Sequence, residues 1–433
     1  MKERELIVYK DFEDGALLND MVYLMDNYKD EKADTDKLKS MFYSCFHKLL
    51  ELAGHFGFYG NLWHCYLSNL LVNNENSYSM ACEIVGEVTG TINDCVLHDM
   101  EILKELYDYD FTDMTTSLGI RDFNLALDYT SSSRESKVYN TRICSRIVEL
   151  AKRFNENNTP AEMKQTLTAF YKDYGVGRFG LHKAFRIEHT DNGANIIPIT
   201  NIAHVSLDDL IGYEDAKKKL IDNTEAFVQG RVANNCLLFG DAGTGKSSSI
   251  KAIANKYYED GLRIIEVYKH QFVDLNDVIA QIKNRNYKFI LYMDDLSFET
   301  FETEYKYLKA VIEGGLEKKP KNVLIYATSN RRHLVNEKVS ERGENAREDE
   351  VHFGDTMQEK LSLYNRFGVT IYFGSPDKKQ YNNIVTELAK REGLDIDNDK
   401  LLLLANKWEL AHGGMTGRTA VQFINYLKGT GNI

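Results

Sequence analysis

Apolar residues recur every three or four positions through most of residues 1–175, a spacing that places them on one face of a helix. Four such faces run from Leu17 to Met25, from Leu38 to Leu50, from Val96 to Tyr107 and from Ile143 to Leu150. Pro160 is expected in the first turn of a further helix, where a proline sacrifices no backbone hydrogen bond. The pattern predicts a mostly helical N-terminal domain, residues 1–175, with a docking or regulatory role.

The pattern changes over residues 176–205. Two short apolar stretches, Phe185–His189 and Ile196–Ile199, flank Asp191-Asn192-Gly193, which is typical of a hairpin turn. We therefore expect a hairpin and a linker in this segment.

Short apolar runs alternate with helical patterns over residues 206–375. Such runs suit strands that are buried on both faces of a parallel sheet, and the alternation indicates an α/β class. Five parallel strands are expected at Cys236–Phe239, Arg263–Val267, Phe289–Met293, Val323–Thr328 and Val369–Phe373. Residues 376–433 predict a small helical lid domain, with helices over Gln380–Arg391, Asp399–Leu410 and Arg418–Leu427.

Composition and charge narrow the class of partner. The 433 residues are 43% hydrophobic and 27% charged, as in ordinary globular proteins. Residues 1–200 hold 21 Lys and Arg against 31 Asp and Glu, and no Lys or Arg occurs from Leu49 to Leu103. An acidic front half repels phosphate backbones, so nucleic acid is a disfavoured partner for it.

Two features bear on the compartment. The start of the chain is too charged for a signal peptide, and residues 52–74 contain histidines, asparagines and glycines, which favour a buried helical hairpin over a membrane span. The six cysteines form no C-x-x-C pair. We expect reduced, buried thiols in a cytoplasmic protein without membrane contact.

The candidate chemistry begins at residues 240–248. The first eight residues fit G-x-x-x-x-G-K-[ST], the pattern of a phosphate-binding loop, between an apolar strand and a helical pattern. Glycines there let backbone N–H groups approach phosphates, Lys246 would reach the β- and γ-phosphates, and Ser247 would bind Mg²⁺. The predicted nucleotide-binding residues of this segment are Gly240, Asp241, Ala242, Gly243, Thr244, Gly245, Lys246, Ser247 and Ser248.

Two carboxylates follow the apolar strand Phe289–Met293. Asp294 at the strand end would hold Mg²⁺, directly or through water. The adjacent Asp295 could polarise an attacking water. A nucleotide hydrolase needs both functions.

The loop and the paired acids, with three later signals, resemble an AAA+ ATPase. The signals are Ala327-Thr328-Ser329-Asn330, Leu363-Tyr364-Asn365-Arg366-Phe367-Gly368 and Gly417-Arg418. The resemblance implies that Asn330 orients water as sensor 1 and that Arg418 contacts phosphate from the lid as sensor 2. It also implies that Arg366 is the arginine finger, which reaches a neighbouring subunit's γ-phosphate.

The segment Leu210-Ile211-Gly212-Tyr213 resembles the stretch that covers adenine in AAA+ proteins, which gives Ile211 and Gly212 a nucleotide-binding role. A closer resemblance, over roughly residues 176–430, is to the bacterial ATP-binding family called domain of unknown function 815. It rests on residues 209–214, 294–299, 327–334 and 359–362. That family implies an AAA+ fold and ATP binding, but names no substrate.

Two positions depart from the wider AAA+ pattern. Asp295 stands where many AAA+ proteins have glutamate, and its shorter side chain is expected to slow turnover. Residues 268–273 follow the second strand without the glycine of the aromatic–apolar–glycine loop in protein-unfolding machines, so polypeptide threading is not expected.

The charged stretch 331–358 is interpreted as a solvated insertion, with a subunit or partner contact as the alternative.

The expected function is ATP hydrolysis that drives conformational change or remodelling of a protein partner, bound through residues 1–175. The cofactors are ATP and Mg²⁺. Because Arg366 would complete a neighbour's site, we expect a homo-oligomeric ring or spiral and a slow or assembly-dependent ATPase. Two alternatives stay open: a nucleotide-gated adaptor with little hydrolysis, and an ATPase acting on DNA that resembles helicase loaders and transposition helpers.

Overall fold

A computed structural model describes residues 3–130, 136, 138–191, 193–200, 202, 204–298, 304–313, 320–330 and 365–430. The chain divides into two compact units, Met1–His182 and Lys183–Ile433.

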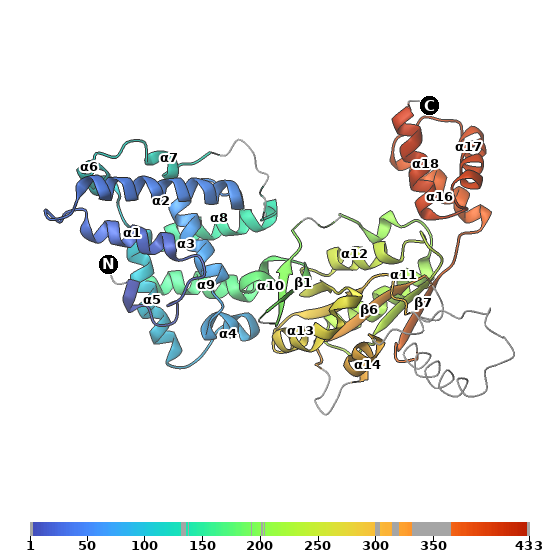
Figure 1. The fold of residues 1–433 in the computed structure, drawn as a ribbon, viewed down its shortest axis with the longest axis horizontal. Helices are drawn as coiled ribbons and strands as arrows, with labels where there is room; N and C mark the ends of the chain where they lie inside the picture. Colours follow the sequence, from blue (N-terminus) through green and yellow to red (C-terminus); the bar gives the residue numbers. More distant parts are fainter. Residues whose placement is uncertain are drawn as a thin grey trace. The chain divides into compact units, whose positions relative to one another are not determined.

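The described part of the first unit is helical (Figure 1). The expected apolar faces lie on α1, α2, α5 and α8, and Pro160 is the first residue of α9. A short 3₁₀ helix, η1 (Glu3–Glu5), precedes these helices. Its α-helices are α1 (Ala16–Asn27), α2 (Thr35–Phe56), α3 (Leu62–Asn73), α4 (Ser77–Val85), α5 (Ile92–Tyr107), α6 (Thr112–Ser117), α7 (Asn124–Leu127), α8 (Thr141–Glu156), α9 (Pro160–Tyr174) and α10 (Gly177–Leu181).

Capping residues set the ends of the main helices in this unit. The Asp34 carboxylate accepts hydrogen bonds from two backbone N–H groups in the first turn of α2, and Gly57 ends that helix at φ +78°. Thr159 and Glu162 form a capping box at the start of α9. These signals explain why the helices begin and end near their predicted positions.

Helix α3 lies at the centre of the first unit. Ten of its residues are buried, including Trp63, whose indole N–H donates to the Leu106 carbonyl at 2.9 Å. Residues 52–74 therefore comprise the end of α2, a turn and a buried α3. Among the described residues, no helix combines the length and apolarity needed to cross a membrane.

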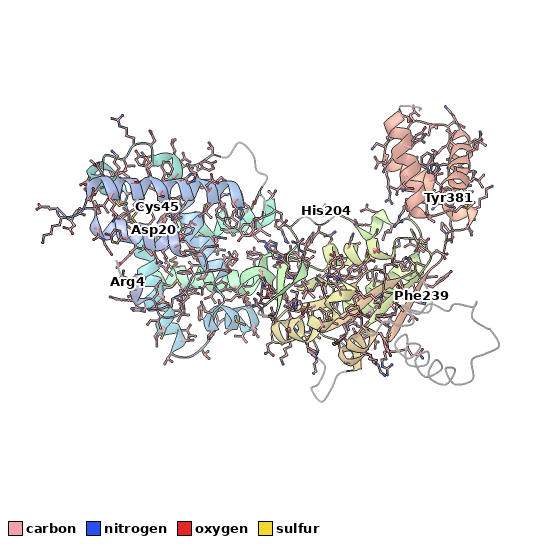
Figure 2. The ribbon with its side chains drawn as sticks, in the orientation of Figure 1. Arg4, Asp20, Cys45, His204, Phe239 and Tyr381 are labelled. Carbon is pink, nitrogen blue, oxygen red and sulfur yellow. The ribbon has the colours of Figure 1, made fainter. Side chains whose placement is uncertain are left out.

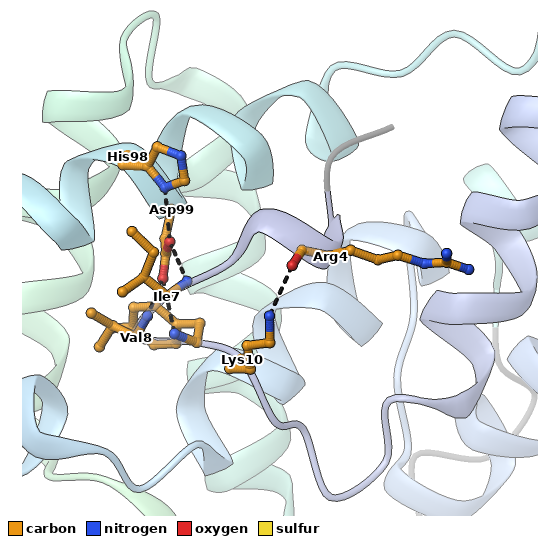
Figure 3. A network of polar contacts seen from close by, with 7 residues as sticks. Arg4, Ile7, Val8, Lys10, His98 and Asp99 are labelled. Carbon is orange, nitrogen blue, oxygen red and sulfur yellow. Dashed lines mark hydrogen bonds and ion pairs between the residues drawn. The ribbon is translucent and has the colours of Figure 1, made fainter.

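A buried carboxylate fixes the start of the chain to α5 (Figure 3). Asp99 is fully buried and accepts hydrogen bonds from the backbone N–H groups of Ile7, Val8 and Tyr9, at 2.8, 2.7 and 2.9 Å. Its Oδ1 atom also lies 3.2 Å from Nδ1 of His98. Hydrogen bonding of this kind offsets the cost of burying a charge.

All six cysteines are free thiols. Five are buried as expected, whereas Cys95 is half-buried at the side of α5. Burial raises the pKa of Cys45 to about 11, which keeps this thiol protonated and unreactive at neutral pH.

The second unit contains a seven-stranded sheet in the order β2-β1-β4-β5-β6-β3-β7. The α/β class is confirmed, and the five expected strands are all present and parallel to one another. The prediction of five strands in total was wrong, because β1 of the hairpin pairs in parallel with the edge of β4. The strands are β1 (Ala184–Thr190), β2 (Gly193–Pro198), β3 (Cys236–Gly240), β4 (Leu262–Glu266), β5 (Lys288–Met293), β6 (Val323–Ser329) and β7 (Val369–Phe373).

Burial explains why the hairpin joins the sheet. Phe185, Ile187 and Ile196 are all but fully buried, and a free β4 edge would leave backbone groups without partners. The alternation that predicts the hairpin therefore also supplies an apolar face for the sheet.

Helices cover both faces of this sheet, as Figure 1 shows. One face carries α11 (Glu214–Val228) and α12 (Lys246–Lys256); the other carries α13 (Leu275–Ile282) and α14 (Tyr305–Glu313). Two 3₁₀ helices also belong to this unit: η2 (Leu207–Asp209) precedes α11, and η3 (Lys269–Asp274) precedes α13.

The lid consists of α16 (Lys378–Arg391), α17 (Asn398–Ala411) and α18 (Gly417–Thr430), as the helical pattern predicts. Tyr381, labelled in Figure 2, is fully buried between these helices. Ile211, from the segment before α11, packs against the same apolar cluster. The apolar core of the lid therefore also contacts the segment that leads into α11 of the α/β domain.

Candidate nucleotide-binding site

The phosphate-binding loop connects the end of β3 with the start of α12. The strand β3 lies between β6 and β7, and β6 pairs with β5. Because these strands are parallel, their carboxyl ends meet at one edge of the sheet, where ligands bind in open α/β folds. Helix α12 begins at Lys246, so its N-terminal N–H groups and positive dipole end lie at this edge.

A cavity of about 600 Å³ opens at this edge and is shared between the α/β domain and the lid. Its size is in the range of small-molecule sites. Of the predicted residues, it is lined by Ile211, Ala242, Gly243, Thr244, Gly245, Lys246, Ser247, Ser248, Asp294, Asp295, Asn330 and Arg418.

The glycines of the loop occupy positions that a larger residue would not fit. Gly240 has φ +137°, and a Cβ atom added there would lie 2.0 Å from the Phe373 carbonyl oxygen. Gly243 has φ +75°, and a Cβ atom added there would lie 3.1 Å from side-chain atoms of Thr416 and Arg418 in the lid. The loop therefore packs closely against both β7 and the start of α18.

Lys246 is buried and turned back on the loop. Its Nζ atom donates to the carbonyl oxygens of Gly240 at 2.9 Å and Asp241 at 2.6 Å. Burial lowers the pKa of this ammonium group, and the nearby carboxylates of Asp241, Asp295 and Asp294 oppose that shift. The cation is thus held among dipoles and negative charges at the cavity wall.

Asp294, which follows β5, is hydrogen-bonded to Ser247 of α12 and to Thr328 of the neighbouring strand β6. Its Oδ1 atom accepts hydrogen bonds from the Ser247 hydroxyl at 2.7 Å and the Thr328 hydroxyl at 2.5 Å. Burial acts to raise the pKa of Asp294, but the hydrogen bonds from these hydroxyls outweigh it, so the pKa lies below its usual value. The carboxylate is therefore charged at neutral pH.

This donor set fits Mg²⁺. A serine hydroxyl and a carboxylate are hard oxygen ligands, and Mg²⁺ is usually bound by one or two carboxylates with waters and substrate phosphates. Phosphate and water would supply the remaining ligands. No cluster of three or more His, Cys, Asp or Glu that could hold a metal ion occurs within the described ranges.

Asp295 adopts an uncommon backbone conformation, with φ +49°. Its Oδ1 atom accepts a hydrogen bond from the Asn330 amide at 2.7 Å. Asp295 and Asn330 are thus in direct contact at the cavity.

The lid and the segment before α11 close the other side of the cavity. The backbone N–H of Arg418 donates to the Gly243 carbonyl at 3.1 Å, which places the start of α18 on the loop. Ile384 and Leu388 of α16 add apolar lining near Ile211. The Tyr213 hydroxyl donates to the Gly374 carbonyl at 2.9 Å, and burial raises its pKa to about 12.

Four predicted site residues do not line the cavity. Gly240 and Asp241 form the base of the loop, where Asp241 accepts hydrogen bonds from Ser375. Gly212 stands between two residues that line the cavity but does not line it itself. Arg366 precedes β7 and does not line the cavity. The stretch 268–273 lies largely in the 3₁₀ helix η3, and the charged stretch 331–358 lies outside the described residues.

Thr328 is a site residue that the sequence reasoning missed. It lies within the quoted Ala327–Asn330 motif, and it stands two residues before Asn330. Because side chains alternate along a strand, this spacing puts both on one side of the sheet. Val421 and Gln422 of the lid also line the cavity, but the alternation of side chains along a strand does not predict them.

The fold and the cavity define an α/β protein with a phosphate-binding loop at the carboxyl edge of its sheet. The chain belongs to the family described as "Protein of unknown function (DUF815)", whose family model matches residues 180–431.

Comparison with individual proteins gives shorter or weaker matches. An AAA-ATPase of Arabidopsis thaliana is 35% identical over 104 residues, which cover 22% of this chain and 21% of that protein. The RuvB Holliday junction branch migration motor of Thermotoga maritima is similar at 19% identity with a TM-score of 0.37, covering 52% of this chain and 64% of its own. A single-substitution mutant of the same RuvB gives 20% identity and the same TM-score and coverage. The chain thus spans about a fifth of the plant relative and less than two thirds of RuvB.

A Gly240→Ala substitution tests the close approach of the loop to β7. We expect a loss of stability of at least ~3 kcal/mol, because the methyl group would overlap the Phe373 carbonyl in addition to the cost of a positive φ. Gly393→Ala is the control, since Gly393 also has a positive φ but no atom within 4 Å of the added Cβ. Thermal unfolding of both variants measures the difference. Equal midpoints would contradict the packing described here.

Proposed function

We propose that the protein binds ATP with Mg²⁺ in this cavity and hydrolyses it to drive a conformational change that remodels a protein partner. One observation carries the proposal: Lys246, Ser247, Asp294, Asp295, Asn330 and Arg418 line a single cavity. This cavity combines phosphate-binding cations, oxygen ligands for a metal and a carboxylate for water. The six free thiols suit a reducing compartment such as the cytoplasm.

The reaction assigns a task to each side chain. Water attacks the γ-phosphorus atom, the bond to the β–γ bridging oxygen breaks, and ADP and phosphate leave. Asp295, held by Asn330, orients the water and accepts its proton. Lys246 and Arg418 neutralise charge on the phosphates. Mg²⁺, when bound by Ser247 and Asp294, supplies further charge neutralisation.

Replacement of Lys246 by alanine is the first test of the site. We expect ATP binding to weaken and turnover to fall at least ~100-fold, because the cation at the phosphates is lost. Steady-state phosphate release and equilibrium binding of a fluorescent ATP analogue measure both effects. Lys251→Ala is the matched control, since Lys251 is an exposed lysine of the same helix and does not line the cavity. Turnover like that of the wild type in Lys246→Ala would refute the site, and ATP binding without hydrolysis in the wild type would instead support a nucleotide-gated adaptor.

Arg366 tests whether assembly completes the site. Its absence from the cavity of its own chain is compatible with action on a neighbouring subunit in a homo-oligomeric ring or spiral. We expect Arg366→Ala to retain ATP binding and to lose turnover. Mixing it with Lys246→Ala subunits should restore part of the activity, because an intact loop then meets an intact arginine. Turnover that is independent of protein concentration down to the monomer would contradict action in trans.

The outer face of α8 is the surface we assign to the protein partner. Arg142, Arg146, Lys152 and Arg153 line a hollow of about 410 Å³ together with Tyr59 and Tyr174, and the Arg146 guanidinium lies 4.1 Å from the Tyr174 ring centroid. Arginine and aromatic groups suit a carboxylate-rich segment. A long nucleic acid would extend over the acidic remainder of this unit.

Charge reversal on α8 tests this assignment. We expect the double substitution Arg146→Glu and Arg153→Glu to weaken binding of a fluorescein-labelled decaglutamate about tenfold or more, measured by anisotropy. Lys32→Glu with Lys37→Glu makes the same change in net charge elsewhere on this unit and should leave binding unchanged. Tighter binding of a ten-nucleotide single-stranded DNA than of the peptide would overturn the assignment and favour the DNA-acting alternative.

A further inference from the structure

Thr328 occupies a position between the two acids of the site. It is almost fully buried at the end of β6, and the pairing of Met293 with Ala327 places it beside Asp294. Its hydroxyl donates to Oδ1 of Asp294 at 2.5 Å and accepts from the backbone N–H of Asp295 at 2.9 Å. A single hydroxyl group therefore donates a hydrogen bond to Asp294 and accepts one from Asp295.

The backbone of Thr328 supports the same turn. Its carbonyl oxygen accepts a hydrogen bond from the Leu296 N–H at 2.7 Å. The N–H groups of Asp295 and of Leu296 therefore both donate to this threonine. Asp295 has φ +49°, which is strained for a residue with a side chain. Such a conformation persists only where the surroundings hold it. Here Thr328 makes the shorter bond to the Asp295 N–H, which also donates to Oδ1 of Asp294 at 3.2 Å.

The consequence reaches the side chain of Asp295. In this turn its carboxylate points to Asn330, whose amide donates to Oδ1 at 2.7 Å. Without the bond from Asp295 N–H to the hydroxyl, the backbone could relax toward a negative φ and turn the carboxylate away. Asp294 would lose one of its hydrogen-bond donors at the same time.

We propose that the Thr328 hydroxyl is a positioning group for both acids, and that it sets the turnover rate by holding Asp295 in its strained turn. The inference rests on the proposed ATPase function. It goes beyond it by assigning a kinetic role to a residue that need not touch nucleotide.

Thr328→Val removes the hydroxyl and keeps the shape of the side chain. We expect kcat for ATP hydrolysis to fall about 10- to 100-fold, since a misplacement of about 1 Å costs rates of this order, while the Kd for ADP changes less than about threefold. Thr328→Ser keeps the hydroxyl and should recover most of the rate. Thr224→Val is the control, because Thr224 is an equally buried threonine, on α11 and outside the cavity.

A double-substitution cycle identifies the route of the effect. If Thr328 acts through Asp295, the loss in Thr328→Val should be largely absent when it is combined with Asp295→Asn. An unchanged kcat in Thr328→Val, a Thr328→Ser protein as slow as Thr328→Val, or full additivity with Asp295→Asn would each overturn the inference. The wild-type rate is measured first. Absence of wild-type hydrolysis overturns the proposed function together with this inference, whereas normal hydrolysis with an unaffected Thr328→Val overturns only the inference.

Discussion

The hydrogen bonds on one carboxylate oxygen, Oδ1 of Asp294, join three parts of the chain at the site. Ser247 comes from the first turn of α12, Asp294 follows β5, and Thr328 ends β6. These segments are far apart in the sequence and meet only because the parallel sheet brings its carboxyl ends to one edge. Accurate placement of the loop relative to the acids therefore depends on the register of β3, β6 and β5. A shift of one residue in any of these strands would turn its site residue to the opposite face.

Much of this arrangement is predictable from local sequence. The apolar runs of the five predicted strands and the glycines of the loop have short-range physical causes, which a single sequence displays. Asp294 and Asn330 each follow a predicted strand, and parallel strands bring such residues to one edge of the sheet, where both line the cavity. The pairing of β1 with β4 is different, because it depends on which backbone edge is left free once the sheet has formed. No local pattern states that, and the expected count of five strands failed for this reason.

The contribution of Thr328 illustrates a second limit. Threonine is common in strands for reasons of shape alone, so its presence in β6 carries no functional signal by itself. Its role becomes visible only when Asp295 is seen at a positive φ with its N–H directed to the hydroxyl. Backbone strain of this kind arises from the whole neighbourhood and is read from structure. The lid residues at the cavity are also identified only from the structure, because their positions depend on how the lid packs on the loop.

The loop is hydrogen-bonded to both ends of the segment that carries the lid helices. Asp241 accepts hydrogen bonds from the backbone N–H of Ser375 at 2.7 Å and from its hydroxyl at 2.8 Å, just before α16. These bonds lower the pKa of Asp241, so the carboxylate is charged at neutral pH and this link weakens only on acidification. At the other end, the Gly243 carbonyl accepts from Arg418 at the start of α18. A ligand that changed the shape of the loop would therefore alter the hydrogen bonds just before the first lid helix and at the start of the last lid helix together.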